Sequence, residues 1–216
     1  MVLRDLSGEK NTASNDKLLD LLMNEKHTKE RIIEKAVDLF YEYGYAKASM
    51  RGLAKNLGMS NSSIYNHFTN KEEILFTIIE RAGGTLLSKL QEITERNHEP
   101  IECLKEMIFS QVCLFKTKGK ELSIFVDELY QLPDQLRDAC NKQHRRIFDL
   151  YRNKLREIED THVTNMIDKT VTTFGIIGIM NWVYHWAKEN GSLSTEEIAI
   201  QIINLLFYGI LRTDDL

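Results

Sequence analysis

The sequence predicts an all-α protein of about nine helices, with a small N-terminal domain of three helices and a larger C-terminal helical domain. Apolar residues recur at helical spacing along most of the 216 residues. No stretch alternates Val, Ile or Thr with polar residues for long enough to indicate a sheet. Only two prolines, Pro100 and Pro133, interrupt the chain, so long helices fit between them.

The N-terminal region predicts one helix after a polar tail. Residues 1–25 are expected to form this tail, with at most one short helix. From residue 28 onward, an apolar stripe from Ile32 to Tyr41 recurs at the spacing of an amphipathic helix. Gly44 follows this stripe and is expected to end the helix, because glycine accepts the left-handed conformation found just after helices.

Two short helices are predicted at residues 49–57 and 61–68. Ser49 and Ser60 stand at their starts, where a hydroxyl can accept a hydrogen bond from an unpaired backbone N–H. Gly58 separates the helices and allows a tight turn. Apolar side chains at helical spacing can hold the pair together, namely Leu53, Ala54, Leu57, Ile64 and Phe68. This layout is typical of a helix-turn-helix, here at residues 49–68.

Six longer helices are predicted to complete the chain. Thr69 or Asn70 opens the first of them, and each proline stands in the first turn of a later helix. Ser194 and Glu197 form a capping box before the last helix. The predicted ranges are 70–96, 100–116, 121–131, 133–160, 163–188 and 195–211. The chain therefore divides into the tail, a helix-turn-helix domain at 26–86 and a C-terminal domain at 87–216.

Charge is distributed unevenly between these domains. Residues 26–76 have a net charge of +2 and the remainder −6, and no Asp or Glu occurs between Gly44 and Lys71. An acid-free helix pair that carries Lys47, Arg51 and Lys55 can approach a polyanion without repulsion. The pattern favours a small nucleic-acid-binding domain on an acidic body. For the serines and asparagines alone, a solvated polar helix is the alternative.

Short polar side chains cover the second helix of the pair. Asparagine can pair bidentately with adenine, and serine can bond several base edges, so both suit the major groove. Tyrosine and histidine can donate to phosphates, and a lysine adds positive charge at a helix start. The predicted DNA-contacting residues are Ser49, Arg51, Ser60, Asn61, Ser62, Ser63, Tyr65, Asn66, His67 and Lys71.

The order of these residues resembles the DNA-binding domain of the TetR family of bacterial repressors. The resemblance covers residues 26–86 and is carried by Gly58-Met-Ser60, Ile64-Tyr65, His67-Phe68 and Lys71-Glu72-Glu73. It implies that Tyr65, His67 and Lys71 hold phosphates. It also implies that Asn61, Ser62 and Ser63 face bases, with Asn66 beside them and Arg51 reaching in from the preceding helix. Gly52 departs from the family pattern, which has a polar or charged residue there.

The last two predicted helices carry more apolar surface than one core requires. Helix 163–188 is apolar on more than one face, and its glycines would let a second helix approach closely. Because the family resemblance agrees with this excess, we expect a homodimer through a four-helix interface. An ordinary intramolecular core is the alternative for part of this surface. The predicted interface residues are Gly175, Gly178, Trp182, Ile198, Ile202 and Leu205.

Aromatic and soft side chains on the central helices predict a cavity for a hydrophobic small molecule, where the TetR family has its ligand cavity. Most of them also suit an ordinary core. The predicted lining is Phe109, Cys113, Phe148, Tyr151, Phe174, Ile177 and Asn181. Residues 178–197 resemble the part of the family that controls fatty-acid metabolism, which implies an acyl-CoA effector. Its phosphates would need cations, and the nearest cluster is Lys142, Arg145 and Arg146.

Enzymatic and membrane functions find no support in the sequence. The histidines and cysteines lack metal-ligand spacing, and there is no phosphate-binding glycine loop or nucleophile elbow. We therefore expect no enzyme, no metal and no cofactor. Residues 170–187 are uncharged, but Thr170, Asn181 and His185 would be costly in lipid, so a buried bundle helix is expected. The N-terminus shows no signal peptide.

These observations predict a cytoplasmic bacterial repressor that binds operator DNA as a homodimer and is released by a hydrophobic small molecule. A repressor of a multidrug efflux system, which responds to aromatic or cationic compounds, is one alternative. A monomeric helical module whose basic patch binds acidic proteins is another. The residues alone do not choose between repression and activation, and they do not give the effector, the operator sequence or a role for the tail.

Overall fold

The computed structural model describes residues 8–164, 166, 168–187 and 191–210, and side chains between 22 and 208 within these ranges. This part of the chain contains nine α-helices and two short 3-10 turns, which confirms the all-α prediction. The elements are α1 (Gly8–Tyr43), η1 (Tyr45–Lys47), α2 (Met50–Leu57), α3 (Asn61–Tyr65), α4 (Lys71–Arg96), α5 (Pro100–Cys113), α6 (Phe115–Asp127), η2 (Leu129–Gln131), α7 (Asp134–Thr161), α8 (Lys169–Trp186) and α9 (Thr195–Ile210).

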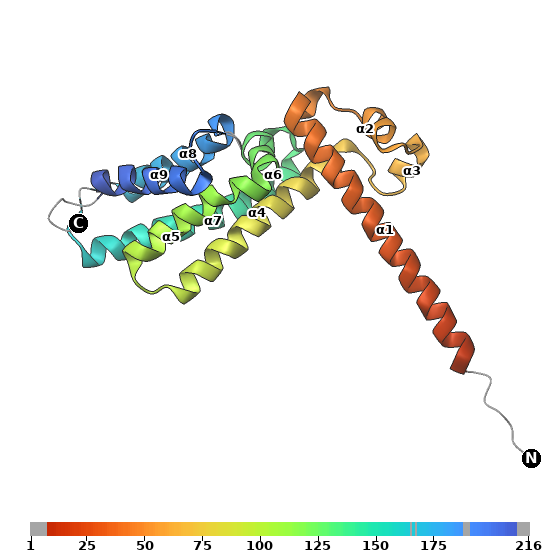
Figure 1. Ribbon diagram of the computed structural model, residues 1–216, viewed down its shortest axis with the longest axis horizontal. Coiled ribbons are helices and arrows are strands. Elements are labelled where there is room, and N and C mark those ends of the chain that lie inside the picture. The colour runs from red at the N-terminus through yellow and green to blue at the C-terminus, as the bar shows by residue number, and fades with distance from the viewer. Residues whose placement is uncertain (1–7, 165, 167, 188–190, 211–216) are drawn as a thin grey trace, which may run out of the picture.

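Helix α1 is longer than the sequence predicted. It begins at Gly8 rather than at residue 28, and much of the predicted tail is therefore helical; residues 1–7 lie outside the described part. Thr28 lies inside this helix, and its hydroxyl donates to the Asn24 carbonyl at 2.9 Å, one turn earlier. In Figure 1 the N-terminal half of α1 extends away from the other helices, whereas its C-terminal half contacts α2, α4 and α6.

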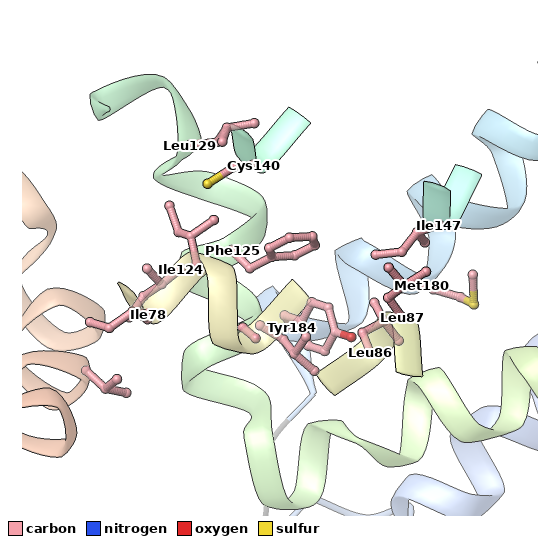
Figure 2. Packing of buried hydrophobic residues seen from close by; sticks show 14 of the residues in the cluster. Ile78, Leu86, Leu87, Ile124, Phe125, Leu129, Cys140, Ile147, Met180 and Tyr184 are labelled. Atoms are coloured by element: carbon pink, nitrogen blue, oxygen red, sulfur yellow. The ribbon is translucent and has the colours of Figure 1, made fainter. Parts of the chain in front are cut away.

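Helix α4 connects the N-terminal helices to the C-terminal helical body. It contacts α1 near its start and α5, α6 and α7 along the rest of its length. Figure 2 shows Ile78 and Leu86 of α4, Phe125 of α6, Ile147 of α7 and Met180 of α8 in one buried cluster. Burying each such side chain stabilises the fold by roughly 1.5–3 kcal/mol. Helix α4 is therefore one firm attachment between the small N-terminal helices and the C-terminal body, beside the contact of α1 with α6.

Gly83 allows α6 and α7 to approach α4 closely. A Cβ atom at this position would lie 2.6 Å from Cε2 of Phe125 and 2.5 Å from Oε1 of Gln143. No real Cβ contact is this short, so only glycine fits without displacing a neighbour. Gln143 also donates from Nε2 to the Glu80 carbonyl at 3.2 Å, which joins α7 to α4 at the same level.

The structure corrects the predicted boundary between helices 100–116 and 121–131. Helix α5 ends at Cys113, and α6 starts at Phe115 and ends at Asp127, with a non-helical Lys118 inside it. The Phe115 ring stacks on Tyr184 of α8, with 6.2 Å between centroids. This contact between distant segments holds the first residue of α6 against α8, and local sequence does not indicate it.

Helix α8 also starts later than predicted, at Lys169 instead of residue 163. The Asp168 carboxylate accepts a hydrogen bond from the Val171 N–H at 2.8 Å and so caps the helix. The predicted end at residue 188 lies outside the described residues. Among the helices that the structure describes, α8 included, none is long and apolar enough to cross a membrane.

The cysteines behave as small apolar side chains. Cys103 and Cys140 are buried and Cys113 is partly buried, and none of the three forms a disulfide. Burial raises the pKa of the Cys140 thiol to about 11. The thiol therefore stays protonated at neutral pH and contributes packing.

Candidate nucleic-acid interface and small-molecule pocket

Helices α2 and α3 form the predicted helix-turn-helix. The Ser49 hydroxyl accepts from the Gly52 N–H at 3.1 Å, and the Ser60 hydroxyl accepts from the Ser63 N–H at 3.1 Å. Gly58 ends α2 in the left-handed conformation, with φ 66° and ψ 25°. Ser49 and Ser60, two of the four serines on the predicted contact list, therefore cap α2 and α3, which fixes where α3 begins.

The outer face of α3 is polar and open to solvent. Ile64 is fully buried and Phe68 nearly so, and they hold α3 on the rest of the domain. Ser63 and His67 of the predicted contacts are half-buried. The others on this face are exposed, namely Asn61, Ser62, Tyr65 and Asn66. The structure thus presents exposed polar side chains, with both donors and acceptors, on the solvent side of α3 and at its C-cap.

The end of α3 differs from the prediction. The helix stops at Tyr65, not at residue 68. The His67 and Phe68 N–H groups both donate to the Ile64 carbonyl at 3.1 Å, so the last turn is tightened. Nδ1 of His67 is enclosed and has no hydrogen-bond partner within the described residues.

Free positive charge surrounds this helix pair. Lys47, Arg51 and Lys55 are exposed, and none of them forms an ion pair with any described residue. The flanking acids along the chain are Glu42 and Glu72. Unpaired cations on a segment that contains no Asp or Glu between Gly44 and Lys71 give a positive potential that attracts a phosphate backbone.

Lys71 has a structural partner that the sequence did not reveal. Its Nζ donates to the carbonyls of Tyr45 and Ala48 at 2.9 and 3.1 Å, and lies 3.9 Å from the centre of the Tyr45 ring. These bonds attach the start of α4 to the connection between α1 and α2. An ammonium has three donors and two of them are used here, so the predicted phosphate contact stays a prediction.

A second candidate site is a pocket of about 1080 Å³ between α7 and α8. Four residues predicted to line a ligand cavity meet there, namely Phe148, Phe174, Ile177 and Asn181. The rings of Phe148 and Phe174 are 4.7 Å apart at 46°. Lys142, Arg145 and Arg146, which the sequence suggested as a basic entrance, also line this pocket. Sequence reasoning missed His144, whose ring lines the pocket and stacks on Phe125 at 3.9 Å.

Three other residues predicted for the lining do not belong to this pocket. Tyr151 is completely buried, and its hydroxyl donates to Oε1 of Gln111 at 2.9 Å. Phe109 and Cys113 are partly buried and pack against the core of the chain. These side chains lie on helix faces that turn toward neighbouring helices, and helical spacing alone does not separate such faces from a cavity wall.

Helix α8 also exposes an apolar stripe. Val171 is 70%, Phe174 64% and Trp182 63% exposed. Gly175 and Gly178 lie on the same helix, and apart from the adjacent residues and backbone of that helix, no heavy atom among the described residues lies within 4 Å of where a Cβ would be. On α9, Leu205 is also exposed. Gly175, Gly178, Trp182 and Leu205 are therefore available to a partner, as the interface prediction requires.

Two predicted interface residues are not available. Ile198 and Ile202 are buried, and α9 packs against α5 of the same chain. The interface prediction is therefore corrected for these residues: their face of α9 supplies the chain's own core. The opposite face of α9 exposes Ile200, Leu205 and Tyr208 instead.

Comparison with known families decides the identity of the two domains. Residues 32–78 match the family described as bacterial regulatory proteins of the tetR family. Residues 97–210, more than half of the chain, match the tetracyclin repressor-like C-terminal domain. The chain belongs to the TetR family. It is therefore a DNA-binding transcriptional regulator and not an enzyme, and its N-terminal helix-turn-helix is the family's DNA-binding domain.

Relatives cover most of this TetR-family chain. The HTH-type transcriptional repressor KstR2 of Mycobacterium tuberculosis is 23% identical over 84% of this chain and 92% of its own. The structure of that ketosteroid transcriptional regulator has a TM-score of 0.80, with 20% identity, 86% of this chain and 95% of its own covered. AibR, solved in complex with isovaleryl coenzyme A and operator DNA, has a TM-score of 0.77 at 26% identity, covering 83% and 97%.

The DNA-binding domain is joined to the C-terminal domain at α6. The Tyr45 N–H donates to Oε1 of Glu128 at 3.1 Å, and Nζ of Lys120 lies 2.6 Å from Oδ1 of Asp38. The partners are 83 and 82 residues apart along the chain, so no sequence pattern pointed to them. Glu128 and Phe125 lie one turn apart at the end of α6. The hydrogen bond between Glu128 and Tyr45 is therefore close to the stack of Phe125 on His144.

Proposed function

We propose that this TetR-family regulator is a homodimeric repressor, released from its operator by a hydrophobic small molecule, with an acyl-CoA as the favoured effector. The observation that carries the DNA-binding part is the capped, acid-free α2–α3 pair with its exposed polar face. In this proposal α3 enters the major groove, where Asn61 and Ser62 contact base edges. Tyr65 and the third donor of Lys71 contact phosphates, and Arg51 reaches in from α2.

The dimer would form through the exposed stripe of α8 together with the outer face of α9. Because Phe174 and Gly178 of this stripe also line the α7–α8 pocket, the partner subunit would border that pocket. Gly175 and Gly178 support a close approach of two α8 helices, because neither carries a side chain that would hold them apart. Two-fold symmetry then requires a pseudo-palindromic operator, with half-sites about 34–36 Å apart. The exposed Trp182 and Leu205 would become buried, which supplies apolar area for a permanent interface.

The effector part of the proposal rests on the pocket between α7 and α8. Its wall is apolar at Phe148, Phe174 and Ile177, and its rim carries three cations. An organic anion with an apolar portion matches this lining better than the aromatic cation of a multidrug effector. The AibR complex, which contains isovaleryl coenzyme A, supports the same class of ligand.

A route from this pocket to the DNA-binding domain runs through α6. A ligand that displaces His144 would act on Phe125, which fits against Gly83 of α4. One turn further along α6, Glu128 holds the backbone of Tyr45 in the DNA-binding domain. Movement of α6 and α4 would change the spacing of the two α3 helices. By linkage, the effector must favour the non-binding state by as much as it weakens operator affinity, typically about 1–3 kcal/mol.

Sedimentation and DNA selection test this function together. We expect a dimer at low micromolar concentration that retains a small set of genomic fragments, and expression of a reporter behind such a fragment should fall when the protein is present. A monomer without any preferred fragment would favour the protein-interaction module. A dimer that increases reporter expression would exclude repression. Release by a planar aromatic cation, but by no acyl-CoA, would favour the multidrug alternative.

A further inference from the structure

Ser60 and Ser62 are joined by a hydrogen bond on the exposed face of the helix-turn-helix. Their Oγ atoms lie 2.9 Å apart, and both side chains are open to solvent. Ser60 Oγ also accepts from the Ser63 N–H at 3.1 Å, which is the bond that caps α3. Within the described residues, no other group forms a hydrogen bond with either hydroxyl. The capping hydroxyl is therefore shared between the backbone of α3 and a side chain that is predicted to contact bases.

The cap of the preceding helix lacks this second bond. Ser49 Oγ accepts from the Gly52 N–H at 3.1 Å and caps α2 in the same way. In the part of the chain that the structure describes, no side-chain hydroxyl bonds Ser49. The link from cap to neighbouring hydroxyl is therefore a feature of α3 and not a consequence of capping itself.

The hydrogen between the two hydroxyls decides what Ser62 can offer to DNA. A hydroxyl has one donor hydrogen and two acceptor lone pairs. If Ser60 donates to Ser62, the Ser62 hydrogen can point outward, and Ser62 acts as a donor. If Ser62 donates to Ser60, Ser62 presents only a lone pair and acts as an acceptor. A serine without such a bond can do either, so it discriminates poorly between base edges.

The capping bond favours donation by Ser60. A hydroxyl that already accepts from a backbone N–H is polarised by that bond and becomes a better donor. When DNA covers this face and excludes water, donation by Ser62 would leave the Ser60 hydrogen without a partner among the described residues, which is unfavourable. The opposite direction pairs both hydrogens, because Ser60 donates to Ser62 and Ser62 donates to the DNA.

We infer that Ser60 is a positioning residue for base recognition: it holds the Ser62 hydroxyl as a donor, so that Ser62 selects a base edge with an acceptor. In the major groove the acceptors are N7 and O6 of guanine, N7 of adenine and O4 of thymine, whereas cytosine presents only an amino donor. This inference rests on the proposed contact of α3 with base edges. It adds the direction of one hydrogen bond and the residue that sets this direction.

Binding of the full-length protein to DNA duplexes with base analogues measures the direction. Selection from random duplexes gives a preferred sequence, and Ser62→Ala then identifies the base pair at which preference falls. At this pair, 7-deazapurines, 2-aminopurine and a pyrimidine without O4 each remove one acceptor. Removal of the acceptor that Ser62 contacts should weaken binding about fivefold or more, whereas removal of an amino donor should have little effect. A loss only on removal of an amino donor, or no base pair affected by Ser62→Ala, would overturn the inference.

Aspartate at the capping position removes the Ser60 hydrogen and keeps the cap. Aspartate caps helices as well as serine does, but its carboxylate accepts and cannot donate. In Ser60→Asp, Ser62 therefore donates to the carboxylate and presents a lone pair to the DNA. The ratio of affinities for the intact and the acceptor-free duplex should then fall to near one. Ser60→Thr keeps both the cap and the hydrogen, and this ratio should stay as in the unchanged protein.

Ser49→Asp is the matched control, because it places the same charge at the cap of α2, where no second hydroxyl is bonded. Both aspartates repel phosphates and should weaken binding to all duplexes alike, but only Ser60→Asp should remove the dependence on the acceptor. An equal ratio in the two variants would contradict the role of Ser60. Thermal unfolding shows whether each variant is folded. If Ser60→Asp binds too weakly to measure, Ser60→Ala removes the same hydrogen without added charge and should lower the same ratio.

This inference and the proposed repressor can fail separately. If the protein lowers reporter expression from its preferred duplex but Ser60→Asp retains the dependence on the acceptor, the repressor stands and the role of Ser60 falls. If the dependence is lost as expected but the protein raises reporter expression or sediments as a monomer, the role of Ser60 stands and the proposed homodimeric repressor falls. A protein that selects no duplex would overturn both.

Discussion

The backbone N–H of Tyr45 donates to the carboxylate of Glu128 at 3.1 Å, across 83 residues of sequence. The carbonyl of the same Tyr45 accepts from Lys71 at 2.9 Å. One residue in the connection between α1 and α2 is therefore held by the C-terminal domain on one side and by the start of α4 on the other. A movement of α6 relative to α4 would therefore displace Tyr45 or break one of its two hydrogen bonds.

Glu128→Ala should weaken communication between the pocket and the DNA. Operator affinity without effector should change little, whereas the loss of affinity on adding effector should shrink by part of the typical coupling of about 1–3 kcal/mol. Glu128→Gln is the matched control, because its amide oxygen can still accept from the Tyr45 N–H. Operator titrations with and without an acyl-CoA give the coupling. An unchanged coupling in the alanine variant would remove this contact from the route.

Asn61→Ala or Ser62→Ala should relax base preference at a single operator position. The expected loss there is roughly 1–3 kcal/mol, because a bidentate or donor–acceptor contact to one base edge disappears. Tyr65→Phe should instead weaken binding to all sequences alike, since phosphates carry no base information. Titration against a set of operators with single base-pair changes separates the two patterns. An equal loss of affinity for all operators in the Asn61 and Ser62 variants would show that these residues contact the DNA phosphates instead of the bases.

Lys71→Ala should lower both stability and DNA affinity. Two hydrogen bonds to backbone carbonyls are lost, each worth about 0.5–1.5 kcal/mol. If its third donor contacts a phosphate, the salt dependence of operator binding should fall by roughly one unit per half-site. Denaturant unfolding and a salt titration measure the two effects independently. A changed sequence preference with an unchanged salt slope would contradict the phosphate role.

Local features of the DNA-binding domain could be predicted, because each depends on residues within one helical turn. Ser49 and Ser60 as caps, Gly58 as the left-handed stop and the Ser194–Glu197 capping box all follow from side chains and backbone groups three residues apart. The polar face of α3 follows from the same helical spacing. The sequence-derived DNA interface is therefore largely a local property.

Features that depend on distant contacts could not be predicted. At the start of α6, Phe115 stacks on Tyr184 of α8, and Ile198 is a core residue because α5 packs against α9. Helical spacing shows that two faces of α9 are apolar, but not which of them the chain itself covers. For the same reason, Tyr151 could be recognised as a central aromatic residue but not as a core residue with a satisfied hydroxyl.

Acid should destabilise the protein through His144. Desolvation by burial lowers the pKa of this histidine in the folded protein, and its neutral ring stacks on Phe125. The unfolded chain binds the proton more tightly than the folded protein does. The stabilisation of the folded state by neutral His144 is therefore fully present above the ordinary pKa near 6.5. It is lost as the pH falls from this value toward the lower pKa of the folded state. Tm measured between pH 7.5 and 5.5 should fall less in His144→Phe, which keeps the stacked ring. If Tm fell equally with pH in both proteins, His144 would not contribute to the loss of stability in acid.

Gly83→Ala and Gly84→Ala form a matched pair that tests the close approach of α4, α6 and α7. At Gly84 the nearest heavy atom to a Cβ is Nε2 of Gln143 at 3.8 Å, an ordinary contact, so alanine should stabilise the helix by up to about 1 kcal/mol. At Gly83 the end of Gln143 can move aside, but the Phe125 ring is held by His144. Overpacking there should cost roughly 1–3 kcal/mol and shift the effector response, because α4 and α6 are forced apart. Denaturant unfolding and operator titrations on both variants measure this. Equal stability in the two would show that Phe125 is not confined between α4 and α7.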